Sequence, residues 1–290
     1  MFGRLTLLLA LATSLHAAVD SAALDAARVL YNERGKSADA QKAFEALAAT
    51  DPKDPDLNFF LGQLANRRDD PAKAVTYFEA AVAASPNEAR HHHGLGDAYG
   101  RSAQKAGLLS KFGLAKKCVA SYERAVELAP TNLDFRQSLF EFYRQAPGIA
   151  GGGFDKASAQ AEAIKKLDAN RGRFAFATLY VGEKKHAEAL AQFDEVLKVS
   201  PDDYAALYQV GRLAALTGEY LDRGLTSLRR CLELPVPTPA NTPGHAATHW
   251  RIGVILEAKK DLPGARAAYE AALKLEPKFP AALESLKKLK

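Results

Sequence analysis

Prolines recur along this chain at a nearly constant interval, and that interval limits the folds open to it. Six of them close successive segments, at Pro52, Pro86, Pro130, Pro201, Pro235 and Pro277. The intervals are 34, 44, 71, 34 and 42 residues. Two of them equal 34, two equal one 34-residue unit with an insertion, and the interval of 71 spans two units with a short insertion. Proline cannot continue a helix and disfavours helical geometry in the residue before it. A period of this length predicts stacked helical repeats in place of one conventional core.

A second pattern recurs upstream of each proline. It has a small residue, then usually an aromatic residue four places later, then a small or apolar residue, in the segments 40–47, 74–81, 118–125, 157–164, 189–196, 224–231 and 265–272. An earlier segment of five of the units carries another small residue, at Gly62, Gly96, Ala177, Gly211 and Gly253. Spacings of three and four residues place these side chains on one face of a helix. We therefore expect two helices per unit, with small residues where their backbones meet and aromatic rings filling the space between them.

These offsets resemble the tetratricopeptide repeat family, whose unit has two antiparallel helices, A and B, in 34 residues. The resemblance implies an all-α fold, a right-handed superhelical solenoid. It covers seven units, at 21–54, 55–88, 89–132, 133–169, 170–203, 204–240 and 246–279, and a capping helix follows at 280–290. The match has departures. Arg28 and Phe140 stand where a small residue is usual, and the fourth unit lacks its terminal proline.

The composition agrees with helical repeats. The chain has 56 alanines and only four isoleucines, whereas strands favour β-branched residues. Hydrophobic residues make up 48% and charged residues 25%, which excludes intrinsic disorder. A formal net charge of +5 is mild for 290 residues and does not indicate nucleic-acid binding.

The N-terminal residues 1–18 are predicted to be a secretory signal peptide. Arg4 precedes an apolar run from Leu5 to Leu15, and small residues follow at Ala17 and Ala18. The run is too short for a membrane span. The alternative is a buried or amphipathic N-terminal helix. We expect export, to the periplasm or outside the cell.

Three insertions interrupt the 34-residue period. They lie at 104–114, at 147–153 and at 236–244. The second is glycine-rich and resembles a variant of secreted bacterial members of the family. All A–B turns of such an array lie on one edge, so the first two insertions are expected to form a composite lip. Its residues include Pro147, Gly148, Gly151, Gly152 and Gly153. Loop growth without a function is the alternative.

Few residues carry catalytic or metal-binding signals. The glycine-rich insertion lacks the Gly-Lys-Ser/Thr ending of a phosphate loop and no strand precedes it. The side chains of His91, His92 and His93 are about 100° apart on a helix and cannot converge on one ion. Cys118 and Cys231 lie three repeats apart, so we expect buried free thiols. We predict no enzymatic activity, no cofactor and no metal.

The remaining candidate is the concave face that helices A line in this family. The resemblance places on it Phe59, Gln63, Asn66, Arg67, His93, Asp97, Arg101, Gln137, Glu141, Arg144, Gln145, Phe174, Tyr208, Arg212, Trp250 and Arg251. Guanidinium groups bind carboxylates and aromatic rings offer contact area, so we expect a protein or peptide partner, with an acidic segment in the groove. Three alternatives stay open: contacts through the lip, self-association, and a small anion at the glycine-rich loop.

Overall fold

The computed structural model describes residues 21–238 and 243–289, and the regular secondary structure in this part of the chain is entirely helical. The predicted signal peptide and residues 239–242 of the third insertion lie outside the described residues. The described helices are α1 Ser21–Asn32, α2 Ser37–Thr50, α3 Pro55–Arg67, α4 Pro71–Ala84, α5 Ala89–Lys105, α6 Leu108–Leu128, α7 Leu133–Gln145, η1 Gly148–Ala150, α8 Phe154–Leu167, α9 Ala169–Gly182, α10 His186–Val199, α11 Tyr204–Thr217, α12 Leu221–Glu233, α13 His245–Ala258, α14 Leu262–Leu275 and α15 Pro280–Lys288.

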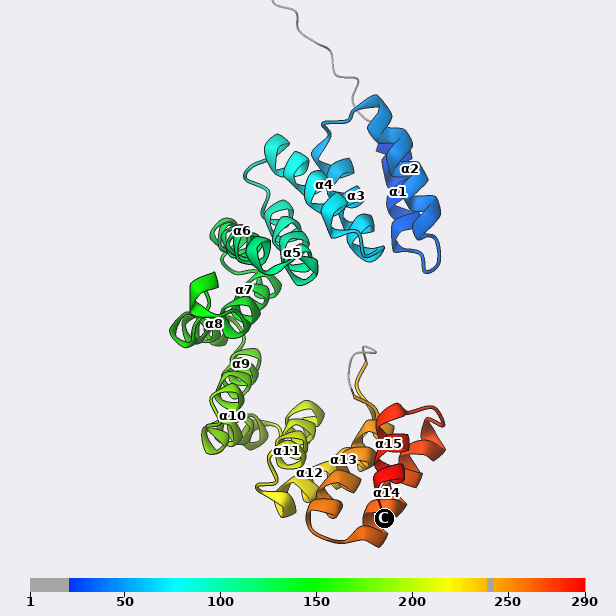
Figure 1. Cartoon of the computed structure of the whole chain (residues 1–290), viewed down its shortest axis with the longest axis vertical. Coiled ribbons are helices and arrows are strands. Elements are labelled where there is room, and N and C mark those ends of the chain that lie inside the picture. Colours follow the sequence, from blue (N-terminus) through cyan, green and yellow to red (C-terminus); the bar gives the residue numbers. More distant parts are fainter. Residues whose placement is uncertain (1–20, 239–242, 290) are drawn as a thin grey trace, which may run out of the picture. The chain divides into compact units, whose positions relative to one another are not determined.

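The chain divides into two compact units. The N-terminal unit holds the described residues up to Leu139 together with Ala146–Gly151, and the C-terminal unit holds Phe140–Gln145 and the chain from Gly152 onward. Within each unit, consecutive helices pack as hairpins in chain order, as Figure 1 shows. This is an all-α solenoid of helical repeats, as the proline interval predicts.

The predicted small residues let the two helices of a repeat approach closely. A Cβ added to Gly62 of α3 would lie 2.9 Å from the Phe78 ring of α4. At Gly96 of α5 the corresponding distance, to the Tyr122 ring of α6, is 2.6 Å. Gly253 and Tyr269 meet in the same way in the C-terminal unit. The expectation that small residues of helix A pack against aromatic rings of helix B is therefore confirmed at these three pairs.

The helix ends follow from local sequence. Asp54, Asp70, Asp203 and Asp261 each accept a hydrogen bond from a free amide in the first turn of the next helix. The fourth repeat has no terminal proline, and Asp168 closes α8 and caps α9 in its place. Short polar side chains thus set helix starts both between repeats, at Asp54, Asp168 and Asp203, and within them, at Asp70 and Asp261.

The first insertion is helical, which corrects the expectation of a loop between helices A and B at 104–114. Residues 104–105 extend α5 and residues 108–114 belong to α6, so only Ala106 and Gly107 separate the helices. Leucines, lysines and alanines favour helix, which is why the added residues lengthen α6 to 21 residues. In the part of the chain that the structure describes, no helix is both long enough and apolar enough to cross a membrane.

Candidate functional site

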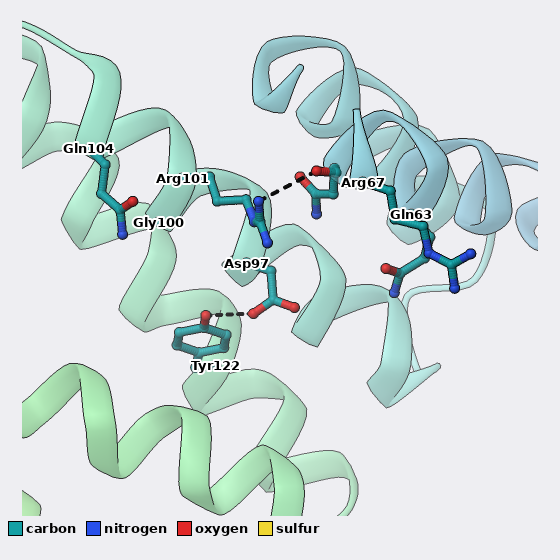
Figure 2. A pocket seen from close by; sticks show the side chains of 8 residues that line it. Gln63, Arg67, Asp97, Gly100, Arg101, Gln104 and Tyr122 are labelled. Atoms are coloured by element: carbon teal, nitrogen blue, oxygen red, sulfur yellow. Dashed lines mark hydrogen bonds between the residues drawn. The ribbon is translucent and has the colours of Figure 1, made fainter. Parts of the chain in front are cut away.

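A polar pocket opens on the helix A face of the N-terminal unit. Its volume is about 350 Å³. Helices α3, α5 and α6 supply its lining, which consists of Gln63, Asn66, Arg67, Asp97, Gly100, Arg101, Gln104 and Tyr122 (Figure 2). We call this set the groove pocket. Five of these residues are among those that the sequence places in the groove: Gln63, Asn66, Arg67, Asp97 and Arg101.

Asn66 is the most buried of the polar side chains that line the groove pocket. It is 6% exposed, and its Oδ1 atom has no hydrogen-bond partner. A buried amide oxygen without a donor costs about 1–3 kcal/mol. The atom is covered in this structure, so a ligand N–H group, such as a peptide backbone brings, would satisfy it once the Asn66 side chain turns toward the pocket.

The two arginines of the groove pocket are held by neighbouring repeats. Arg67 donates to the carbonyl of Tyr31 at 3.0 Å, and its guanidinium lies 3.8 Å from the Tyr31 ring centroid. Arg101 reaches the Asn66 carbonyl at 3.4 Å. Neither arginine forms an ion pair in the described residues, so both keep their charge available to a ligand.

The carboxylate of Asp97 is held from α6. The Tyr122 hydroxyl donates to Asp97 Oδ1 at 2.7 Å, as the dashed line in Figure 2 marks. Burial and the adjacent carboxylate raise the pKa of Tyr122, so the phenol keeps its proton. His93 lies 3.7 Å from the other oxygen of Asp97 and accepts or donates a bond with Ser138 at 2.8 Å. The pocket therefore combines two cations with one fixed anion.

A second pocket lies in the C-terminal unit and is more apolar. Its volume is about 180 Å³. Arg144 and Arg212, both predicted groove residues, stand at a surface lined by Ala177, Thr178, Val181, Gly182, Phe193, Gln209, Leu213 and Leu216. Arg144 is paired with Glu141 at 2.6 Å, which neutralises much of its charge. This pocket is thus less basic than the groove pocket.

Other predicted groove residues make internal contacts. The Tyr208 hydroxyl accepts a bond from Arg251 at 2.7 Å, and Tyr208 is 4% exposed. Trp250 donates to Ser285 of α15 at 3.1 Å and meets Phe279 edge to face. Gln137 lies half-buried on α7. Tyr208 is therefore committed to packing within the last repeats, and Trp250 is committed to holding the capping helix.

Three residues of the groove pocket escaped the sequence prediction. Gly100 and Gln104 continue the helical face of Asp97 and Arg101, at steps of three residues, so the spacing alone would have included them. Gln104 was assigned to an inserted loop instead. Tyr122 was expected only to fill space between helices, yet its hydroxyl reaches the pocket.

The three adjacent histidines point to separate surroundings, as the helical geometry predicts. The His91 ring is 1% exposed and lies 5.5 Å from the Phe59 ring. His92 bonds the Pro86 carbonyl, and His93 bonds Ser138. No cluster of three potential metal ligands occurs in the described ranges. Cys118 and Cys231 are free and buried, which confirms the prediction for both thiols.

The lip residues divide between the two units. In the N-terminal unit, Pro147, Gly148 and Gly151 shape η1, where Gly151 turns with a φ of 95°. η1 packs on α6, and a Cβ on Gly151 would lie 3.5 Å from Val119. In the C-terminal unit, Gly152 precedes Gly153, whose amide donates to the Tyr143 carbonyl at 2.8 Å. The glycines thus serve tight turns, and the Gly153 amide is already occupied.

Comparison with known proteins agrees with this architecture. A family model described as tetratricopeptide repeat matches residues 24–89, 174–222 and 221–282. A tetratricopeptide repeat protein from Parabacteroides merdae is 15% identical, with a TM-score of 0.64 over 92% of this chain and 96% of that one. Yeast Tom70 is 16% identical, with a TM-score of 0.63 over 88% of this chain and 51% of its own. The C-terminal part of a repeat protein from Cytophaga hutchinsonii is 17% identical, with a TM-score of 0.57 over 90% of this chain and 98% of that chain. No curated protein sequence matches the chain.

Proposed function

The chain belongs to the tetratricopeptide repeat family, and from that premise we propose that it is an adaptor that captures an acidic segment of a protein partner in the groove pocket. Proteins of this family generally mediate protein–protein interactions and are generally non-catalytic scaffolds. Our proposal adds three points to that statement: the place of binding, the acidity of the segment and the absence of catalysis.

The observation that carries the proposal is the chemistry of the groove pocket. Arg67 and Arg101 offer guanidinium groups without an ion-pair partner in the described part of the chain. The Asn66 Oδ1 atom accepts no hydrogen bond in the described structure, and the amides of Gln63 and Gln104 offer both donors and acceptors. A peptide segment supplies backbone N–H groups, carbonyls and a carboxylate side chain, which together match this set.

The proposed cellular setting is outside the cytoplasm. Arg4, the apolar run from Leu5 to Leu15 and the alanines at 17 and 18 have the pattern of a secretory signal peptide. We therefore propose that the exported form begins near residue 19 and meets its partner in the periplasm or outside the cell.

The experiment is a selection of random displayed peptides on the purified chain from residue 19 onward. We expect the bound peptides to be enriched in aspartate and glutamate. Arg101→Gln should weaken the best peptide about 10- to 100-fold, since a hydrogen bond to a charged group is worth about 1.5–3 kcal/mol. Asn66→Ala should weaken it less, because only one neutral bond is lost.

Arg212→Gln is the matched control, because it removes an exposed arginine from the pocket of the C-terminal unit. It should leave the affinity of the same peptide unchanged. Selected peptides without acidic bias, or an affinity that Arg101→Gln leaves intact, would refute the acidic groove. Peptides lost only in Arg212→Gln would move the binding site to the second pocket.

A further inference from the structure

The tip of the α5–α6 hairpin is an exposed apolar and basic surface that the groove does not use. Leu108 is 71% exposed and Leu109 is 96% exposed, at the start of α6. We call Leu108, Leu109 and Lys111, together with Lys116 further along α6, the hairpin tip. Fully exposed neighbouring leucines are unfavourable in water unless something covers them.

The hairpin tip projects beyond the helix beside it. Gly96 faces Tyr122 and Gly100 faces Cys118, so each step forward along α5 matches an equal step back along α6. In this register Lys105, the last residue of α5, lies beside Gly113. Residues 108–112 therefore extend about 7 Å past the end of α5, at 1.5 Å per residue. Lys105 also bonds the Asp69 carbonyl at 2.6 Å, which places the preceding A–B turn level with the end of α5. The apex is thus convex.

The chain segment that forms the apex carries charge of one sign. Between Asp97 and Glu123 the sequence contains Arg101, Lys105, Lys111, Lys116 and Lys117 and no acidic residue. Lys105 is paired with Asp69, and Lys117 lies over the Tyr99 ring. Lys111 and Lys116 are exposed and form no ion pair in the described residues. The leucines at the apex are therefore followed along α6 by two lysines, Lys111 and Lys116, that form no ion pair in the described residues.

We propose that the hairpin tip docks on an anionic phospholipid bilayer. A convex apolar apex inserts between headgroups, and flanking lysines contact lipid phosphates, which is how amphipathic surfaces bind membranes peripherally. A protein partner would need a cavity shaped for this apex, whereas a bilayer needs only the apolar tip and the basic flanks. The inference is independent of the groove and its partner, because it uses a different surface.

The test is flotation of the chain from residue 19 onward with vesicles, since the apolar N-terminal run would itself bind lipid. Every variant is made in this background, which retains all described residues. We expect flotation with vesicles of phosphatidylcholine mixed with phosphatidylglycerol and none with phosphatidylcholine alone. Leu108→Ser with Leu109→Ser should reduce the partition at least about tenfold, since most of the inserted apolar area is lost. Lys111→Glu with Lys116→Glu should reduce it about thirtyfold or more.

Matched controls separate the hairpin tip from general charge and exposure. Lys166→Glu with Lys274→Glu makes the same change in net charge on exposed helix positions of the C-terminal unit. Val199→Ser with Leu275→Ser removes two other exposed apolar side chains. Both pairs should float like the wild type. Equal flotation of the Leu108/Leu109 variant, absence of wild-type flotation, or a leucine-dependent dimer in sedimentation without lipid binding would overturn the proposal.

Discussion

The Tyr122 hydroxyl donates a hydrogen bond to Asp97 at 2.7 Å, so an aromatic residue that packs two helices together also fixes a carboxylate in the groove pocket. The ring lies against Gly96 of α5, where a larger residue would collide with it. One side chain therefore serves the core and the surface of the same repeat.

Tyr122→Phe tests this double role. The ring remains and the hydroxyl is lost, so we expect the free energy of unfolding to fall by about 0.5–1.5 kcal/mol. The freed Asp97 carboxylate should then weaken the binding of an acidic peptide several-fold. Tyr269→Phe is the matched control, because Tyr269 donates to Glu257 at 2.8 Å in the C-terminal unit. Urea unfolding should show a similar loss of stability for both variants, whereas peptide titration should respond only to Tyr122→Phe.

Gly96→Ala should destabilise the protein although alanine is the better helix former. The added methyl group would lie 2.6 Å from the Tyr122 ring, and overpacking of this kind costs about 1–3 kcal/mol. Gly113→Ala is the control, since that helical glycine has open space around it. It should stabilise by about 0.5–1 kcal/mol. Urea midpoints followed by circular dichroism compare the two, and a stabilising Gly96→Ala would contradict the packing described.

His91 should make stability fall in mild acid. Burial lowers the pKa of His91 in the folded chain, with a further contribution from Arg90, while Glu88 and Asp56 act in the opposite direction. In the unfolded chain this histidine has its ordinary pKa near 6.5, so in mild acid the unfolded chain binds more protons than the folded one. Stability is therefore lost as the pH falls through that value. His249, whose pKa burial also lowers, adds to the same trend.

His91→Leu should remove part of this pH dependence. Neither ring nitrogen of His91 has a hydrogen-bond partner in the described structure, so an apolar side chain of similar size should raise stability at neutral pH by about 1 kcal/mol. Urea midpoints at pH 7.5 and 5.5 measure the change. His92→Gln, on the same helix, leaves the buried His91 ring in place. This variant should retain the wild-type difference in urea midpoint between the two pH values. If the urea midpoint of His91→Leu fell between pH 7.5 and 5.5 by as much as that of the wild type, another group would be responsible.

Both cysteines should resist alkylation in the native state. Burial raises the pKa of Cys118 to about 12 and that of Cys231 to about 12, so few thiolates form at pH 8. We expect slow labelling by iodoacetamide in buffer and complete labelling of two thiols per chain in urea, read by mass spectrometry. Rapid labelling of one thiol in buffer would reveal local opening of its repeat.

Removal of residues 280–290 should expose the last repeat. Trp250, the only tryptophan, bonds Ser285 and packs against the capping helix α15. Its fluorescence should shift to longer wavelength and the thermal midpoint should fall, because a terminal repeat without a cap leaves apolar surface in water. Trp250→Phe is the control that assigns the signal, and an unchanged spectrum in the truncated chain would contradict this role for α15.

Much of the groove pocket follows from spacing in the sequence. Arg67 and Arg101, and likewise Gln63 and Asp97, lie 34 residues apart and occupy corresponding places in successive A helices, so a repeat of known geometry places them on one face. Gln104 and Tyr122 were missed for different reasons. Gln104 lies in added residues whose helical continuation depends on packing against α6, and the Tyr122 hydroxyl bond depends on a side-chain orientation that spacing does not specify.

The sequence by itself determined that this chain forms helical hairpins. The local periodicity, the packing of a glycine on an aromatic ring and the spacing of the prolines are all properties of a single repeat. It also determined that the three adjacent histidines face different surroundings, which follows from helix geometry. Only the tertiary structure decided which polar groups are satisfied. Trp250 is packed against the cap and the Asn66 oxygen has no partner, because both outcomes depend on groups brought close across helices. Arg144 is paired with Glu141 three residues away on α7, a contact that the spacing allows and that only the side-chain orientation decides.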